Sequence, residues 1–296
     1  MLPHTRFGKT HLSVTRIALG GYPFGGVNKV RNWDPFTPEG RRTAIATVHA
    51  ALDAGINYID TAPSYGNGNS ESIIGEATEH RRDQFTLATK VGYRNLAAQE
   101  VTASVEASLR RLRTEVIDVI QFHGGMYTEA EVNHILQGGL LDALVRLREQ
   151  GKVRFLGFTV EEPWTAQPLI ASGAFDVMQV RYNLIYQAAA LHVLNQAQAA
   201  ELGVATMRTM TSGMFQRIAQ QLAPEWQASH DLYAVAFKFV LSDSRVHLPI
   251  VGMRWPDEVA RNVAIVENFQ PTYDMAGLPR LTAGIYQSED EMNPSR

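Results

Sequence analysis

Residues 58–90 read YIDTAPSYGNGNSESIIGEATEHRRDQFTLATK and contain one complete structural unit. The short apolar segment 58–60 predicts a β-strand, and the segment 85–90 predicts another. Between them, residues 70–80 carry apolar side chains at helical spacing. A strand, a helix and a second strand in this order predict two parallel strands joined by a crossover helix.

The same alternation extends along the whole chain. Strands are predicted at residues 16–21, 58–60, 85–90, 116–123, 153–159, 175–183, 204–210 and 247–252. Helices are predicted after them at residues 38–55, 70–80, 100–113, 140–151, 163–173, 188–203, 230–243 and 256–269. Eight such units in about 250 residues are typical of an α/β fold, the (β/α)8 TIM barrel. Residues 5–15 predict an N-terminal β-hairpin ahead of it.

A doubly wound open sheet is the alternative fold. Such a sheet normally has a Gly-x-Gly-x-x-Gly turn after its first strand, and LGGYPFGG at residues 19–26 does not have that spacing. No linker or internal repeat interrupts the series, so a single barrel domain over residues 1–296 is expected.

Composition excludes several classes of function. The 296 residues are 45% hydrophobic and 19% charged, and the formal net charge is −3. This composition predicts a globular core and gives no basic surface for nucleic acid or membranes. There is no cysteine and no His-Glu-x-x-His motif, so neither thiolate chemistry nor a metal site is expected. The chain starts without a signal peptide, and a cytoplasmic protein is the default expectation.

Four polar residues fall at or just after the ends of consecutive predicted strands. Asp60 ends the second strand, Lys90 the third and His123 the fourth, and Tyr65 lies in the loop after the second. TIM barrels place their catalytic groups at the carboxyl ends of the strands. We therefore expect an acid, an ammonium, an imidazole and a phenol to meet at one mouth.

Alternation along the strands predicts which way these side chains point. Lys90 is expected inside the barrel while Leu87 faces the helices. His123 is likewise expected inside while Phe122 faces outward. Tyr58, a rival phenol, lies deeper in its strand and is expected to fill the barrel interior.

This group suits the protonation of an alkoxide as it forms. A free tyrosine has a pKa near ~10, and the ammonium of Lys90 is expected to lower the pKa of Tyr65. Asp60 keeps the buried lysine charged, and His123 can donate a hydrogen bond to a carbonyl oxygen. An alkoxide formed from a carbonyl needs a hydride donor, and no side chain supplies one, so a nicotinamide cofactor is implied.

Each of the four residues also has an ordinary structural interpretation. Taken alone, Asp60 is typical of a turn or helix cap, and Lys90 of a solvated strand end. A lone His123 is typical of a satisfied buried histidine, and Tyr65 of a loop aromatic over apolar surface. Their joint placement at consecutive strand ends favours the catalytic interpretation.

Six stretches resemble the aldo-keto reductases, in the family's order. They are DTAPSYGNGNSESIIG (60–75), LATKVG (87–92), IDVIQFH (117–123), GKVRFLGFT (151–159), FDVMQVRYNL (175–184) and PIVGMRWPDEVARN (249–262). The resemblance implies an alcohol:NADP+ oxidoreductase that reduces an aldehyde or ketone. In it Tyr65 is the general acid, Lys90 and Asp60 tune that acid, and His123 orients the carbonyl.

The resemblance also implies an extended NADPH across the barrel mouth, with NADH as the alternative. The positions that match cofactor contacts are Gly21, Tyr22, Asp60, Thr159, Gln179, Met207, Arg208, Met210, Gly252, Arg254, Glu258 and Asn262. Among them, Arg208 is expected to bring charge to the pyrophosphate, and Arg254 to the 2′-phosphate.

The chain departs from the family at four positions. Val160 replaces an asparagine, which removes an amide contact, and Met207 replaces a tyrosine that stacks on the nicotinamide in many members. A thioether can still pack against a ring. Gly252 and Glu258 stand where several members have a cation, and Glu258 would repel a 2′-phosphate if it pointed inward.

The long first loop predicts the kind of substrate. It is rich in aromatic residues, and a loop on the catalytic face of a barrel shapes the pocket. An apolar or aromatic small-molecule carbonyl compound is expected to lie against Tyr22, Phe24, Trp33, Tyr93 and His123, with Trp164 as a further candidate. The alternative is that the aromatic residues only pack this loop against the barrel.

Two other functions remain open from the sequence. One is a nucleotide-binding regulatory subunit of the same fold with little turnover. The other is an unrelated barrel enzyme acting on phosphorylated sugars, which would need a phosphate site after the last two strands, where Arg208 and Arg254 lie. The intact group of four residues favours the reductase.

Overall fold

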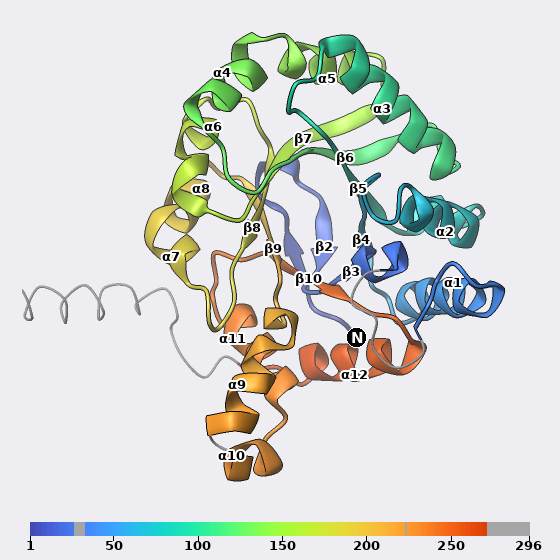
Figure 1. Cartoon of the computed structure of the whole chain (residues 1–296), viewed down its shortest axis with the longest axis vertical. Helices are drawn as coiled ribbons and strands as arrows, with labels where there is room; N and C mark the ends of the chain where they lie inside the picture. The colour runs from blue at the N-terminus through green and yellow to red at the C-terminus, as the bar shows by residue number, and fades with distance from the viewer. Residues whose placement is uncertain (27–32, 223, 271–296) are drawn as a thin grey trace, which may run out of the picture.

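A computed structural model describes residues 1–26, 33–222 and 224–270. Eight parallel strands close a barrel in the order β10-β3-β4-β5-β6-β7-β8-β9. Their bounds are β3 (Ala18–Gly20), β4 (Tyr58–Asp60), β5 (Thr86–Val91), β6 (Ile117–His123), β7 (Val153–Val160), β8 (Val177–Arg181), β9 (Gly203–Met207) and β10 (Leu248–Gly252). In Figure 1 the strands form a central ring, and the helices lie around the outside of that ring. The predicted TIM barrel is confirmed.

Helices connect the strands. Those described are α1 (Pro38–Asp53), α2 (Asn69–Thr78), α3 (Ala98–Arg111), α4 (Glu129–Gln137), α5 (Leu140–Glu149), α6 (Gln167–Ala171), α7 (Ala188–His192), α8 (Leu194–Ala199), α9 (Met214–Leu222), α10 (Pro224–Ser229), α11 (Leu232–Leu241) and α12 (Pro256–Glu267). In the described part of the chain, none is both long and apolar enough to cross a membrane.

The structure differs from the predicted elements in three places. The helix predicted over 188–203 breaks at Val193, whose φ of −130° is not helical, into α7 and α8. The strand predicted over 204–210 ends at Met207, because Arg208 turns to a φ of +57°. Helices α4, α9 and α10 lie within loops and were not predicted.

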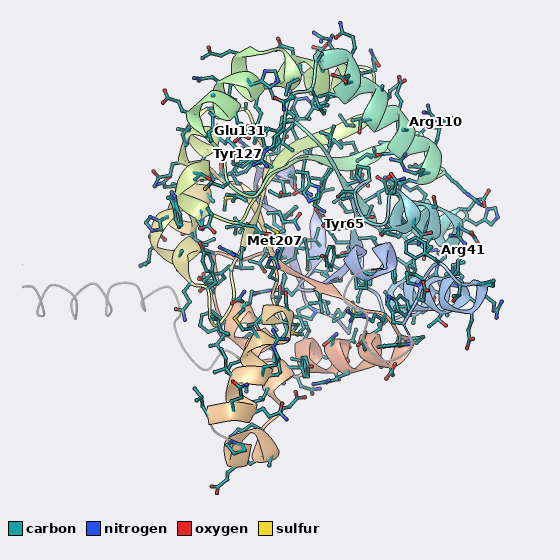
Figure 2. The ribbon with its side chains drawn as sticks, in the orientation of Figure 1. Arg41, Tyr65, Arg110, Tyr127, Glu131 and Met207 are labelled. Carbon is teal, nitrogen blue, oxygen red and sulfur yellow. The ribbon has the colours of Figure 1, made fainter. Side chains whose placement is uncertain are left out.

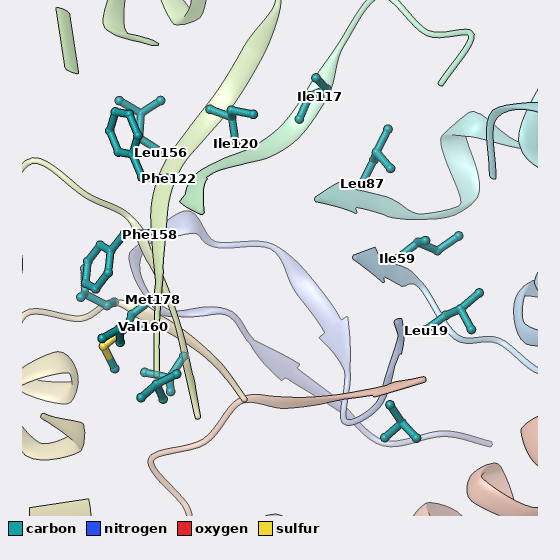
Figure 3. Packing of buried hydrophobic residues seen from close by; sticks show 14 of the residues in the cluster. Leu19, Ile59, Leu87, Ile117, Ile120, Phe122, Leu156, Phe158, Val160 and Met178 are labelled. Atoms are coloured by element: carbon teal, nitrogen blue, oxygen red, sulfur yellow. The ribbon is translucent and has the colours of Figure 1, made fainter. Parts of the chain in front are cut away.

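Side chains alternate between an inner and an outer layer, as the strand pattern predicted. Leu87 and Phe122 belong to the large cluster between strands and helices, and Figure 3 shows them pointing away from the barrel axis. Tyr58, Ala88 and Val119 belong to the smaller cluster inside the barrel. Tyr58 is 1% exposed, so this rival phenol fills the interior as expected.

The N-terminal hairpin, β1 (His4–Arg6) paired antiparallel with β2 (Ser13–Thr15), supplies the bottom of the inner layer. Phe7, between its strands, is fully buried, and its ring centroid lies 5.6 Å from that of Tyr58. It also packs 5.8 Å from the ring of His247. One aromatic side chain from the predicted hairpin therefore closes the end of the barrel opposite the strands' carboxyl ends.

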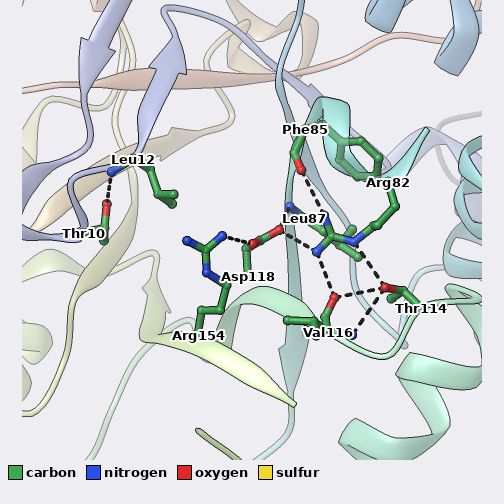
Figure 4. Close-up of polar contacts among 9 residues, drawn as sticks. All are labelled: Thr10, Leu12, Arg82, Phe85, Leu87, Thr114, Val116, Asp118 and Arg154. Atoms are coloured by element: carbon green, nitrogen blue, oxygen red, sulfur yellow. Dashed lines mark hydrogen bonds and ion pairs between the residues drawn. The ribbon is translucent and has the colours of Figure 1, made fainter. Parts of the chain in front are cut away.

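A buried carboxylate holds the start of β6, at that same N-terminal end. Asp118 accepts from Arg82 at 2.6 Å, from Arg154 at 2.5 Å and from the backbone N–H of Leu87 at 2.8 Å (Figure 4). Two guanidinium groups and an N–H satisfy both oxygens, so the charge is compensated. At this end of a TIM barrel such a network serves stability.

We predict that Phe7→Ala destabilises the fold by about 3–5 kcal/mol, because it empties the bottom of the inner layer. Urea unfolding followed by circular dichroism measures this loss. Phe36→Ala is the matched control, since Phe36 is 60% exposed and its loss is expected to change the free energy of unfolding by about 0.5 kcal/mol or less. Equal effects of the two substitutions would contradict the plugging role of Phe7.

Candidate active site

A buried ion pair stands at the carboxyl ends of β4 and β5. The ammonium of Lys90 lies 2.7 Å from Oδ2 of Asp60 and donates a second hydrogen bond of 2.7 Å to the carbonyl oxygen of Thr61. Lys90 is 1% exposed and Asp60 2%. The other carboxylate oxygen, Oδ1, accepts from the amide of Gln121 at 3.3 Å. The predicted inward direction of Lys90 is confirmed.

The two charges of this pair support each other against burial. Burial acts to lower the pKa of Lys90, but Asp60 and then Tyr65 outweigh it, and the net shift is upward. Burial raises the pKa of Asp60, while Lys90 and the amides of Gln121 and Gln179 oppose that rise. Lys90 therefore keeps its proton at neutral pH.

Tyr65 lies above the ion pair. The ammonium of Lys90 is 4.9 Å from the centroid of its ring. Its ring meets those of Tyr22 and His123 edge to face, with centroids 5.1 and 5.8 Å apart. In Figure 2, which has the view along the barrel, Tyr65 and Met207 fall near the centre of the ring of strands. The four residues predicted from separate strand ends thus come together.

The net pKa shift of Tyr65 corrects one expectation. Lys90 does lower this pKa, through its charge and a side-chain hydrogen bond, as predicted. Burial is the larger effect, and with the negative charge of Asp60 it leaves the pKa above the ordinary value. The phenol is therefore protonated at neutral pH. The ammonium of Lys90 lies beside it and can stabilise the phenolate that forms when the proton is transferred.

Close backbone contacts fix the loop that holds Tyr65. A Cβ on Gly25 would lie 2.7 Å from the backbone nitrogen of Gly66, and Gly66 itself has a φ of +64°. The amide of Asn69 donates to the carbonyl oxygen of Phe24 at 2.8 Å. Glycine is required at both positions, so these residues do more than permit a turn.

His123 is neutral over the physiological range. Burial first, and then the charge of Lys90, lower its pKa to about 3. Its Nδ1 lies 3.3 Å from the hydroxyl oxygen of Ser64. If Ser64 donates to Nδ1, the proton sits on Nε2, where it is free to be donated to a substrate oxygen.

Ser64, Thr61 and Gln121 were missed as supporting residues by the sequence analysis. Alternation along the strand does place Gln121 on the same inward face as His123, so the sequence could have indicated its contact with Asp60. The carbonyl of Thr61 and the hydroxyl of Ser64 lie in a loop, where sequence pattern does not predict direction. Their roles emerge only from the distances.

Two buried amide oxygens lie unsatisfied in this part of the barrel. Oε1 of Gln121 and Oε1 of Gln179 accept no hydrogen bond from any described residue. Buried polar atoms of this kind usually have a partner, and an unsatisfied one indicates a ligand or water. Thr159 differs, because its hydroxyl donates to the carbonyl of Gly124 at 2.8 Å and accepts from the N–H of Gly124 at 3.0 Å.

The segment after β9 has an unusual backbone. Arg208, Thr211 and Ser212 all have positive φ, between +51° and +57°, directly before α9 begins at Met214. Non-glycine residues with positive φ are uncommon and are often found at functional sites. Successive backbone N–H groups in such a conformation can point toward a bound anion. Met210 lies in the same segment and packs against the outer core.

The predicted 2′-phosphate region lies between β10 and α12. The carboxylate of Glu258 accepts from the backbone N–H of Arg254 at 2.6 Å and so is held against its own loop. Thr47 fixes the same loop by donating to the carbonyl of Arg254 at 2.8 Å. Gly252 ends β10 in an exposed position, and Asn262 is buried on α12.

The predicted substrate aromatics divide into two groups. Tyr22 is 46% exposed and lies next to Tyr65, and Trp164 is equally exposed. Phe24, Trp33 and Tyr93 are at most 4% exposed and belong to the outer core. The burial of Phe24 and Trp33 favours the alternative interpretation, in which this part of the first loop packs against the barrel. The loop residues 27–32 lie outside the described part.

Gly21 directly follows β3 and starts the first loop. Its N–H donates to the carbonyl of Asp60 at 2.7 Å, and its carbonyl accepts from Ser70 at 2.8 Å. A Cβ on Gly21 would lie 2.5 Å from the Ser70 hydroxyl. This contact sets Tyr22, the next residue, against the ring of Tyr65.

Comparisons with known proteins show the family of this chain. The profile of the aldo/keto reductase family matches residues 16–281. The chain is 26% identical to L-galactose dehydrogenase from Arabidopsis thaliana, over 89% of this chain and 88% of that one. It is also 26% identical to pyridoxal 4-dehydrogenase from Microbacterium luteolum, over 89% and 93%.

Solved structures show the same fold. An aldo/keto reductase from Klebsiella pneumoniae, in complex with NADP and acetate, superposes with a TM-score of 0.74 at 22% identity, covering 95% of each chain. With the family profile matched over most of its length, and with the four polar residues gathered at the barrel mouth, this chain is an oxidoreductase that belongs to the aldo/keto reductase family.

Proposed function

We propose that this protein is an NADPH-dependent reductase that converts an aldehyde or ketone to an alcohol, with Tyr65 as the proton donor. The observation that carries the proposal is the contact of a partly buried phenol with a buried ammonium. The Lys90 ammonium stands 4.9 Å from the ring centroid of Tyr65 and is held by Asp60. Such an arrangement matches a general acid that loses a proton as negative charge develops on a substrate oxygen.

The residues of this chain supply the proton and the orientation. A bound nicotinamide supplies the hydride for the carbonyl carbon. Tyr65 donates its proton to the carbonyl oxygen, and the phenolate that remains is stabilised by Lys90. Neutral His123 donates a hydrogen bond to the same oxygen and fixes its position. Asp60 keeps Lys90 charged throughout.

The residues at the mouth suit a dinucleotide. The unsatisfied Oε1 of Gln179 is an acceptor for a carboxamide N–H. The backbone at Thr211 and Ser212 has positive φ just before α9. Backbone N–H groups in such a segment can bind a pyrophosphate. Thr159 already has two partners, so its contact with a cofactor is the weakest of the expected ones. Met207 replaces a stacking tyrosine and offers a softer contact to a ring.

We infer a preference for NADPH over NADH. Glu258 is held by the backbone N–H of Arg254, so its carboxylate is engaged with its own loop. Arg254 is then the cation suited to a 2′-phosphate. The similar aldo/keto reductase from Klebsiella pneumoniae was solved in complex with NADP and acetate.

The relatives suggest a polar or aromatic alcohol–carbonyl pair. One is a dehydrogenase of L-galactose and another a 4-dehydrogenase of pyridoxal. With Tyr22 as the open aromatic beside Tyr65, we propose a small carbonyl compound with a flat or apolar face.

We predict that Tyr65→Phe lowers kcat for the reduction of 4-nitrobenzaldehyde by about 10²- to 10⁴-fold, because the proton donor is lost. The Kd for NADPH should change little. Loss of absorbance of NADPH reports turnover, and quenching of tryptophan fluorescence reports binding. Tyr58→Phe is the matched control, since Tyr58 is a buried phenol of the preceding strand that fills the barrel.

The two variants together separate the alternatives. Retained turnover in Tyr65→Phe, with loss in Tyr58→Phe, would contradict Tyr65 as the acid. Tight NADPH binding by the unmodified protein, with no turnover across a broad carbonyl panel, would instead favour the regulatory nucleotide-binding subunit.

The pKa directions predict a flat pH profile. At saturating cofactor, kcat/KM for the carbonyl should stay constant between about pH 6 and 9. Tyr65 remains protonated there because its pKa is raised, and His123 remains neutral because its pKa is lowered to about 3. A break near the ordinary histidine pKa of about 6.5, lost in His123→Gln, would show that His123 titrates during turnover and contradict this assignment.

Cofactor preference gives a further prediction. Arg254→Met should raise the Kd for NADPH about ten-fold, the effect of losing one charged hydrogen-bonding contact, and leave the Kd for NADH unchanged. Arg261→Met is the control, because Arg261 lies on α12 but pairs with Asp231 at 2.6 Å. Equal weakening of NADPH and NADH would exclude Arg254 as the 2′-phosphate ligand.

A further inference from the structure

A network of four alternating charges lines the barrel mouth where β7, β8 and β9 end. Arg181 ion-pairs with Glu162, which also accepts from the hydroxyl of Tyr186 at 2.7 Å. Arg181 lies 3.5 Å from the carboxylate of Glu161 as well. Arg208 completes the network by pairing with Glu161 at 2.7 Å. The two negative and two positive charges of the network therefore cancel.

Arg208 is the exchangeable member of this network. It is the most exposed of the four side chains, at 49%, whereas Arg181 is 20% exposed. Its guanidinium makes two hydrogen bonds, from Nε at 3.2 Å and from a terminal nitrogen at 2.7 Å, and both go to one oxygen of Glu161. Arg181 by contrast contacts both acids and stacks 3.6 Å from the ring centroid of Tyr186.

The backbone of Arg208 is held by contacts that do not involve its side chain. Its carbonyl accepts from the amide of Asn183 at 3.1 Å and from the N–H of Thr211 at 2.8 Å. These contacts hold the left-handed turn with a φ of +57°. A rotation of the side chain alone can therefore move the guanidinium from Glu161 toward an anion bound over Thr211 and Ser212.

We propose that Glu161 is a built-in competitor of the cofactor pyrophosphate for Arg208. The inference rests on the proposed binding of a dinucleotide cofactor. It adds that Glu161 limits the affinity of the protein for that cofactor. Without cofactor, Glu161 holds the guanidinium; on binding, the pyrophosphate replaces the carboxylate as its partner. The apparent affinity is then reduced by the fraction of molecules in which Arg208 is still paired.

The size of the effect follows from the exposure of the pair. Exposed ion pairs are weak, and removing this one is expected to tighten NADP+ binding by about two- to five-fold. Glu161 is 31% exposed and keeps Arg181 as a partner, so it does not become an isolated charge after the exchange. This second partner makes the exchange easy in both directions.

Isothermal titration calorimetry with NADP+ tests the proposal on the full-length protein, without any turnover. Glu161→Gln should lower the Kd about two- to five-fold. Arg208→Gln should raise it, and adding Glu161→Gln to Arg208→Gln should have no further effect. Glu162→Gln is the matched control, since it removes the same charge one residue away from a carboxylate that pairs with Arg181 and not with Arg208.

The outcomes separate this inference from the function on which it rests. Failure of the unmodified protein to bind NADP+ or NADPH would overturn both. Binding with an unchanged or higher Kd in Glu161→Gln and in Glu161→Ala would overturn only the competition. An equal gain in Glu162→Gln, or in the Arg208→Gln background, would show a general effect of negative charge and overturn it as well.

Discussion

The buried ion pair of Lys90 and Asp60 is the interaction on which the site depends. Placing an ammonium at 1% exposure costs several kcal/mol unless a charge and hydrogen bonds compensate it. Asp60 supplies the charge at 2.7 Å, and the carbonyl of Thr61 and the amide of Gln121 supply further contacts to the pair. Because both charges are held in the barrel interior, the phenol of Tyr65 meets a permanent cation at a fixed place.

The barrel makes this pair possible. Neighbouring strands put Asp60 beside Ala88 and Lys90 beside Gln121, so both charged side chains stand at the carboxyl ends of adjacent strands. The small side chain of Ala88 leaves room below Lys90, and Tyr58 and Phe7 fill the layers beneath it. Apolar packing below the ion pair keeps water from it, which strengthens every electrostatic contact at the mouth.

The fold and the centre of the site could be predicted from sequence because both follow from periodicity. Alternation of elements indicated the barrel, and alternation within strands indicated that Lys90 points inward. The direction of the Tyr65 pKa could not be predicted, since it depends on how much of the phenol is buried. Nor could the pairing of Arg208 with Glu161, because it requires a left-handed turn that no propensity rule assigns to arginine.

The two charged groups of the mouth differ in how they meet an anion. Lys90 is buried and its partner is fixed, so in the proposed mechanism it stabilises the charge that develops on Tyr65. Arg208 is half exposed and its partner sits at the rim, so it can exchange one anion for another. Both cations are already paired in the described structure, and only the pair of Arg208 with Glu161 is proposed to open when an anionic cofactor binds. The proposal therefore assigns cofactor binding and proton transfer to separate cations, one exchangeable and one permanent.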